Sequence, residues 1–285
     1  MAEPLRSFEI ALQSQDGHLH QLRACLPPEP TAALLWLPAL GVAARHYQPF
    51  AESLAARGIA VFVHEWRGHG SSSLRASRRH DWGYRELLEF DLSASESGVR
   101  QALVDSGNTE LPCIIGGHSL GGQLASCRLG MAPGFASRLW LVASGAPYWR
   151  AFPTPARYWL PLAYRFLPWL ADRCGALPGR RIGFGGTEAR RLIADWARSA
   201  LSGRYRADGL DVDLDAAMVR SAPRVRAVTL ADDWLAPESS LRFLLSKMPR
   251  ATVSTTMLDS RALDARADHF HWMKRPDAIA KALTN

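Results

Sequence analysis

The chain has 285 residues, of which 47% are hydrophobic and 21% charged, a composition that is ordinary for a globular protein and excludes a disordered one. Its net charge of +7 comes from 34 basic and 27 acidic residues, but no run of five or more basic residues occurs, so we expect no nucleic-acid partner. The four cysteines form no C-x-x-C pair and indicate reduced thiols in a reducing compartment.

Neither a secretion signal nor a membrane span is evident in the sequence. The first ten residues, MAEPLRSFEI, lack the charged start and apolar stretch of a signal peptide. The longest apolar run, residues 32–44, is too short to cross a bilayer and contains Pro38 and Gly41. We therefore expect a cytoplasmic protein.

Strand-like and helix-like segments alternate along most of the chain. Residues 7–13 and 18–24 predict a hairpin around the turn Ser14-Gln15-Asp16-Gly17. Further strands are expected at 33–37, 59–63, 112–115, 139–143, 225–230 and 252–257, and helices at 47–57, 82–104, 120–129, 239–248 and 276–283. Short apolar strands alternating with helices predict an α/β fold whose mostly parallel central sheet has helices on both faces.

The alternation stops between the two halves, in a segment rich in Trp, Tyr, Pro and Arg. We expect residues 146–223 to form an inserted cap (lid) of several short helices, and residues 1–145 and 224–285 to form the core. Several aromatic residues of the cap are candidates to line an apolar pocket, although we expect most of them to pack the cap onto the core. The run YWLPLAYRFLPWL suits a membrane surface, but its prolines should disrupt a continuous amphipathic helix, so we expect no membrane binding.

The run IIGGHSLGGQ places Ser119 directly after a predicted strand and directly before a predicted helix. A G-x-S-x-G sequence needs this context, because the tight turn raises the serine hydroxyl above the sheet while glycines keep side chains out of the crossing backbone. The Leu120 amide, at the helix start, would then point at a developing oxyanion. A bare G-x-S-x-G occurs often by chance, but here the context favours Ser119 as a nucleophile.

GGHSLGG and the order of elements resemble the α/β-hydrolase fold over most of the chain. This family's order of nucleophile, acid and base implies an acid after strand 225–230, where ADDWLAP offers Asp233, four residues before Pro237, with Asp232 as the competitor. The family's Gly-His-aromatic sequence implies His269 as the base, although Asp268 stands where glycine is usual.

The histidine beside the implied base needs its own interpretation. His271 is expected to be a surface or packing residue. An H-x-H metal pair of His269 and His271 is disfavoured, because no further ligands follow with metal-site spacing. We expect neither a metal nor a cofactor.

The second oxyanion donor is implied by the loop after the first parallel strand, LPALG. Leu40 is the candidate and Ala39 the next, whereas Pro38 has no N–H to donate. This proline-alanine version, together with RGHGSS at residues 67–72, narrows the resemblance to a bacterial subgroup of predicted hydrolases. That subgroup is similar to the serine aminopeptidase and monoacylglycerol lipase group. We expect the RGHGSS run to be a structural loop near the site.

The sequence therefore predicts a serine hydrolase that cleaves a carboxylic ester through an acyl-enzyme on Ser119, with His269 as base and Asp233 as acid. The same residues would serve a thioesterase, an amidase or aminopeptidase, or a C–C bond hydrolase. A non-catalytic ligand-binding protein on the same fold and a metal hydrolase are the alternatives from other classes. The expected partner is a small-molecule acyl substrate; the oligomeric state stays open.

Overall fold

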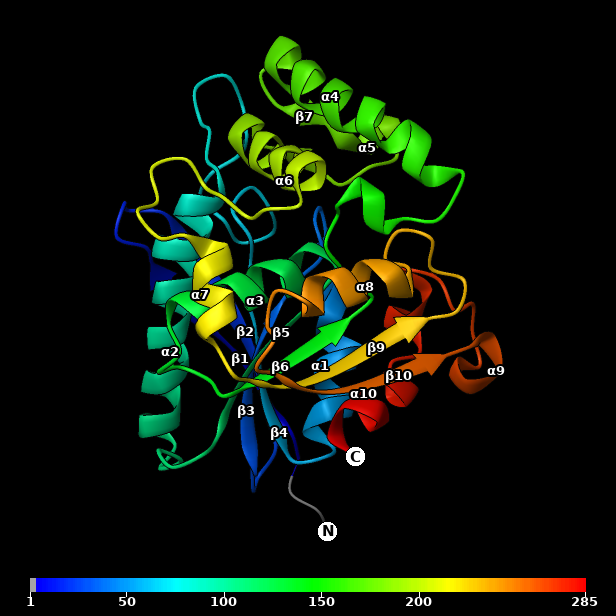
Figure 1. Ribbon diagram of the computed structural model, residues 1–285. Coiled ribbons are helices and arrows are strands. Elements are labelled where there is room, and N and C mark those ends of the chain that lie inside the picture. The colour runs from blue at the N-terminus through cyan, green and yellow to red at the C-terminus, as the bar shows by residue number, and fades with distance from the viewer. Residues whose placement is uncertain (1–3) are drawn as a thin grey trace.

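The structure, a computed structural model, describes residues 4–285, and eight of its strands form one sheet in the order β1-β2-β4-β3-β5-β6-β9-β10 (Figure 1). Their bounds are Arg6–Gln13 (β1), Leu19–Leu26 (β2), Ala32–Leu37 (β3), Ile59–Val63 (β4), Cys113–His118 (β5), Arg138–Val142 (β6), Arg224–Leu230 (β9) and Thr252–Leu258 (β10). The β1–β2 and β2–β4 pairs are antiparallel and the other pairs are parallel, which confirms the predicted α/β fold with a mostly parallel sheet.

Helices cover both faces of the sheet and form two separate hydrophobic cores. One core includes α2 (Leu92–Asp105), α3 (Leu120–Met131), α7 (Leu214–Arg220) and α8 (Glu238–Leu245). The other includes α1 (Gln48–Ala55), the short α9 (Ser260–Leu263) and α10 (Asp277–Thr284). Strands β3 and β4 are buried along their whole length, as expected for strands covered on both sides.

The helix expected at 82–104 begins later than its hydrophobic pattern indicates. Helical backbone begins at Tyr84, and a π-helical segment, Glu86–Asp91, leads into α2, whereas residues 81–83 form a loop. Trp82 extends the apolar pattern because it is buried, yet it belongs to this loop. The Glu86 carboxylate accepts a hydrogen bond from the Gly83 amide at 2.8 Å and marks the start of the helix.

The segment between β6 and β9 lies over one end of the sheet and is dominated by two packed helices, α4 (Ala156–Cys174) and α6 (Arg190–Ser202) (Figure 1). It also holds α5 (Gly179–Ile182) and the two-residue strands β7 (Leu177–Pro178) and β8 (Thr187–Glu188). Helix α7 packs instead against α3 of the core. The boundaries of the cap therefore stay a prediction.

The expectation that prolines interrupt the aromatic run of the cap was wrong. Helix α4 continues for 19 residues through Pro161 and Pro168. The two prolines are seven residues apart and so fall on the same side of the helix, where each removes one backbone hydrogen bond while the other bonds persist.

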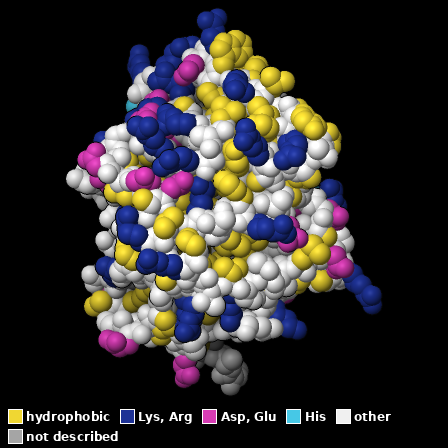
Figure 2. Space-filling view, in the orientation of Figure 1, with side chains coloured by type: hydrophobic (Ala, Val, Ile, Leu, Met, Phe, Trp, Pro, Cys, Tyr) yellow, Lys and Arg dark blue, Asp and Glu magenta, His cyan; other side chains and the backbone are white. Residues whose placement is uncertain are grey.

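Figure 2 shows many hydrophobic side chains over this upper part of the molecule. No helix in residues 4–285 is long and apolar enough to cross a membrane.

Candidate active site

Ser119 occupies the turn between β5 and α3. Its backbone conformation is one that residues other than glycine rarely adopt. Its φ is 54° and its ψ is −120°. The turn is held by backbone hydrogen bonds: the Ser119 amide donates to the Val142 carbonyl at 3.2 Å, and the Ser119 carbonyl accepts from the Gly122 amide at 3.1 Å and from the Ser144 hydroxyl at 2.8 Å. A strained serine on such a turn is typical of a functional site.

Two glycines make this turn possible. A Cβ on Gly117 would lie 2.3 Å from the Gly121 carbonyl carbon, and a Cβ on Gly121 would lie 2.0 Å from the Leu37 carbonyl oxygen. Both contacts are with backbone, which cannot move aside cheaply. The first glycine lets the helix start cross the strand, and the second brings that helix start against the loop that follows β3.

His269 and Asp233 form a buried pair at the carboxyl ends of β9 and β10. Nδ1 of His269 lies 2.7 Å from Oδ2 of Asp233, and both residues are about 95% buried. Oδ1 of Asp233 accepts from the amides of Leu235 and Ala236 at 2.9 and 3.1 Å, so both carboxylate oxygens are occupied. The Trp272 indole donates to the His269 carbonyl at 3.1 Å. These bonds orient the imidazole.

The imidazole of His269 lies beside the nucleophile turn. Its ring centroid is 4.8 Å from that of His118, the residue directly before Ser119. No hydrogen bond joins the Ser119 hydroxyl to His269 within residues 4–285. Catalytic hydrogen bonds are often long in a free enzyme and tighten once substrate is bound.

The competing residues have other partners. The Asp232 carboxylate accepts from the Ser260 hydroxyl at 3.2 Å and is exposed. His271 Nδ1 lies 2.8 Å from Asp268, so the two histidines of the H-x-H pair face different carboxylates. Asp268 also accepts from the amides of Phe270 and His271, and its φ is not positive, which explains why glycine is not required there.

The candidate oxyanion donors differ in whether their amides already have a hydrogen-bond partner. The Ala39 amide donates to the Tyr47 hydroxyl at 2.8 Å, so it is not free to bind an oxyanion. The amides of Leu40 and Leu120 have no hydrogen-bond partner in the described part of the chain. Leu40 and Leu120 both line a cavity of about 10 Å³, whose lining residues include neither Ser119 nor His269.

The loop after β3 is anchored by two buried aromatic residues that the sequence analysis did not single out as site residues. The Tyr47 hydroxyl accepts from the Ala39 amide and also forms a hydrogen bond with Nδ1 of His118 at 2.8 Å. The Trp66 indole donates to the Pro38 carbonyl at 2.8 Å. Burial lowers the pKa of His118 well below its ordinary value, so the ring stays neutral.

Replacing Tyr47 with phenylalanine should loosen this loop. The change leaves the Ala39 amide and His118 Nδ1 buried without a partner, and we expect kcat to fall about ten- to a hundredfold with a smaller change in KM. Steady-state kinetics measure the changes in kcat and KM separately. Tyr84→Phe is the matched control, because the fully buried Tyr84 hydroxyl has no hydrogen-bond partner within residues 4–285. Equal effects of the two variants would contradict a role for Tyr47 in the loop.

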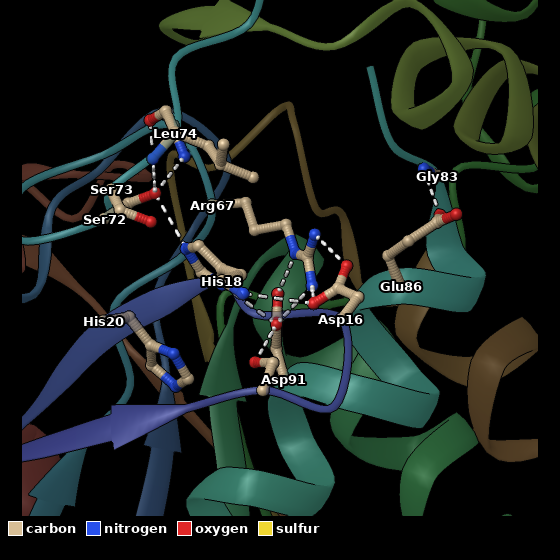
Figure 3. Close-up of polar contacts among 12 residues, drawn as sticks. Asp16, His18, His20, Arg67, Ser72, Ser73, Leu74, Gly83, Glu86 and Asp91 are labelled. Atoms are coloured by element: carbon tan, nitrogen blue, oxygen red, sulfur yellow. Dashed lines mark hydrogen bonds and ion pairs between the residues drawn. The ribbon is translucent and has the colours of Figure 1, made fainter. Parts of the chain in front are cut away.

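A cluster beside this region has the composition of a metal site but not its chemistry. One donor atom from each of His18, His20 and Asp91 lies within 4.8 Å of the others. However, the Arg67 guanidinium donates to both Asp91 oxygens at 2.6 and 2.8 Å, and His18 bridges Asp91 and Ser72 (Figure 3). A cation would have to replace that guanidinium, so these residues do not fit a metal.

The cluster instead fixes the RGHGSS loop to the turn between β1 and β2. Burial opposes the charge of Asp91, but hydrogen bonds from His18 and Arg67 outweigh it and lower the pKa of this carboxyl. Arg67 also donates to Asp16 at 2.8 Å. This ion-pair network is consistent with the structural loop that the sequence analysis expected.

Three buried histidines should make the fold sensitive to acid. Burial lowers the pKa of His20 to about 4, and those of His64 and His118 well below 6.5. Below pH 6.5 the unfolded chain therefore binds more protons than the folded one. Stability should fall by about 1.4 kcal/mol per pH unit for each histidine as the pH drops from 6.5 toward 4. Denaturant titrations across this range measure the slope, and His20→Gln should reduce it by about 1.4 kcal/mol per pH unit. A slope unchanged in that variant would contradict the assignment.

The fold and a matching family model define the class of protein: this chain is a hydrolase of the α/β-hydrolase superfamily. More narrowly, a family model described as serine aminopeptidase, S33, matches residues 28–251, and the chain belongs to that family. No curated protein sequence matches the chain.

Solved structures with the same fold cover almost the whole chain. A carboxylesterase of the thaumarchaeon Nitrososphaera gargenis superposes with a TM-score of 0.61 at 14% identity, over 96% of each chain. An esterase of Pyrococcus furiosus has a TM-score of 0.59 at 13% identity, over 100% of this chain and 95% of its own. A deformylase of N-formylmaleamic acid from Pseudomonas putida has a TM-score of 0.57 at 18% identity, over 98% and 100%. At these identities the similarity establishes the fold alone.

Proposed function

We propose that this hydrolase cleaves a carboxylic ester through an acyl-enzyme on Ser119, with His269 as the base, Asp233 as the acid, and the Leu40 and Leu120 amides as the oxyanion donors. The observation that carries the proposal is the buried His269–Asp233 pair, with atoms 2.7 Å apart, beside a serine held in a strained turn. Asp233 keeps the imidazole proton on Nδ1, so that Nε2 accepts the serine proton.

The reaction proceeds in two halves. As the Ser119 oxygen attacks the ester carbonyl carbon, His269 takes the serine proton, and the carbonyl oxygen acquires a negative charge that the two amides stabilise. Collapse of this intermediate expels the alcohol, which takes the proton from His269. Water then attacks the acyl-enzyme by the same route and releases the acid. Two of the similar solved structures carry esterase names and the matching family model carries an aminopeptidase name, so substrates of both kinds test the choice of an ester over an amide.

A fluorophosphonate probe tests this assignment directly. An activated serine oxygen attacks the phosphorus and displaces fluoride, so peptide mass spectrometry locates the adduct. We expect labelling on Ser119 and its loss in both Ser119→Ala and His269→Ala. A folded protein that neither reacts with the probe nor hydrolyses a small ester would favour the non-catalytic binder. Activity that a chelator abolishes would favour the metal hydrolase.

A further inference from the structure

Helix α4 carries two apolar stripes, and only one of them is covered. The inner stripe packs against α6 and consists of Leu160, Tyr164, Leu167 and Ala171. The outer stripe consists of Tyr158, Trp159, Leu162, Phe166 and Trp169, all of which are exposed. A surface helix ordinarily presents polar side chains on its outer face. The outer stripe is therefore not explained by packing within the chain.

These outer side chains are too exposed and too close together to be scattered surface residues. Tyr158 is 73% exposed, Leu162 70% and Trp169 56%, and the Phe166 and Trp169 rings lie 5.5 Å apart between centroids. Figure 2 shows the hydrophobic side chains of this region as a cluster with basic side chains beside it. Contiguous apolar surface of this kind marks a docking site on most proteins that carry it.

The apolar surface extends from the cap to the edge of the candidate active site. The Trp159 ring lies 5.9 Å from that of Trp234, which follows Asp233 directly and is 57% exposed. Phe270, which follows His269, is also exposed. Whatever covers the outer stripe would therefore lie next to the entrance of the site.

The charges around the stripe indicate what covers it. Arg150, Arg157, Arg165 and Arg173 border or interrupt it, and none of them pairs with a carboxylate in residues 4–285. Asp172 is the single acidic residue of α4. A second copy of the chain would bring its own four arginines against these four, which opposes a symmetric dimer through this face.

An anionic lipid surface satisfies both features at once. Tryptophan, tyrosine and phenylalanine enter the boundary between head groups and acyl chains, while arginines contact lipid phosphates. A groove of about 570 Å³ beside α4 is lined by Tyr148, Trp149, Arg150, Pro161, Arg165, Leu201 and Ser202. Its two guanidinium groups suit the phosphate of a head group. We propose that the outer face of α4, with Trp234 beside it, docks on membranes that contain anionic phospholipid.

The proposal does not rest on the proposed catalytic role of Ser119, and vesicle binding tests it separately. The full-length Ser119→Ala protein, mixed with sedimenting vesicles, avoids turnover. We expect binding to vesicles of phosphatidylcholine with phosphatidylglycerol, weaker binding to phosphatidylcholine alone, and a blue shift of tryptophan emission on binding. Salt should weaken the binding, because the arginines contribute through charge.

Two variants and one control separate the apolar and charged contributions. Leu162→Ser with Trp169→Ser should weaken binding to both kinds of vesicle at least tenfold. Arg150→Gln with Arg165→Gln should lower affinity for the anionic vesicles by about thirtyfold, as expected for two charges at such a surface, and have little effect on the neutral ones. Met257→Ser, which changes an exposed hydrophobic residue of β10, is the control and should bind normally.

Three results would overturn the proposal. The first is a folded protein that binds no vesicles. The second is binding that the α4 variants leave unchanged. The third is a dimer, detected by sedimentation, that the Leu162→Ser and Trp169→Ser changes dissociate, because a second copy would then be the occupant of this face.

Discussion

Replacing Ser119 with alanine is expected to lower kcat by about four to six orders of magnitude while leaving the fold intact. The change removes one oxygen atom from a half-buried side chain, and every hydrogen bond that holds the turn involves the backbone of residue 119. The melting temperature should shift by only a few degrees. Kinetics of a short-chain ester, with the same preparation assayed for melting, measure both effects.

The control is a serine that shares the chemistry but not the environment. Ser254 lies exposed on β10, outside the turn, and Ser254→Ala should retain full activity. A Ser119→Ala protein that is folded and retains turnover near the level of the unaltered chain would rule out an acyl-enzyme on this residue. Activity of that variant that remained sensitive to a chelator would indicate metal-assisted hydrolysis instead.

The parts of the fold that were predictable depend on short-range patterns. Continuous apolar runs of five or six residues, such as Ile59–Val63, can hardly be anything but buried strands between helices. The elbow was predictable because its tight turn needs glycines at fixed positions, where any Cβ would meet backbone. The contact of a Gly121 Cβ with Leu37 shows that this requirement also reaches to the neighbouring strand.

The order of residues along the chain also implied which side chains meet. Strands β9 and β10 are parallel neighbours, so the loops after their carboxyl ends lie together, and Asp233 and His269 belong to these loops. What the sequence left open was the choice between adjacent residues. Asp232 and Asp233 differ in which way each side chain points, and only the fold settles that.

Hydrogen bonds between residues far apart in the chain could not be predicted from the sequence. The Tyr47 hydroxyl joins Ala39 to His118, residues 8 and 71 positions away from it, and no spacing rule connects the three. That contact occupies the Ala39 amide and leaves Leu40 as the candidate donor. The exposure of the outer stripe of α4 was not predicted either, because the sequence of a helix with two apolar stripes does not show which stripe is covered.

Replacing Asp233 with asparagine is expected to lower kcat by about 10⁴-fold without moving any atom far. The asparagine carbonyl oxygen can still accept from the amides of Leu235 and Ala236, as Oδ1 does now. Its NH₂ group would then face Nδ1 of His269 and donate to it. The imidazole proton would move to Nε2, where the base needs a lone pair, so the histidine could no longer accept the serine proton.

Asp232→Asn is a sharp control for this result because it makes the same chemical change one residue earlier. The Asp232 side chain is exposed and hydrogen-bonded to Ser260, so its amide variant should keep kcat within about twofold, as for other surface substitutions. The two variants should melt at similar temperatures and react very differently with the fluorophosphonate probe.

Equal losses of kcat in both variants would mean that the carboxylates act through their combined charge. A loss confined to Asp232→Asn would reassign the acid. A loss confined to Asp233→Asn would mean that the position of the imidazole proton, and with it the ability of His269 to act as a base, depends on this single carboxylate.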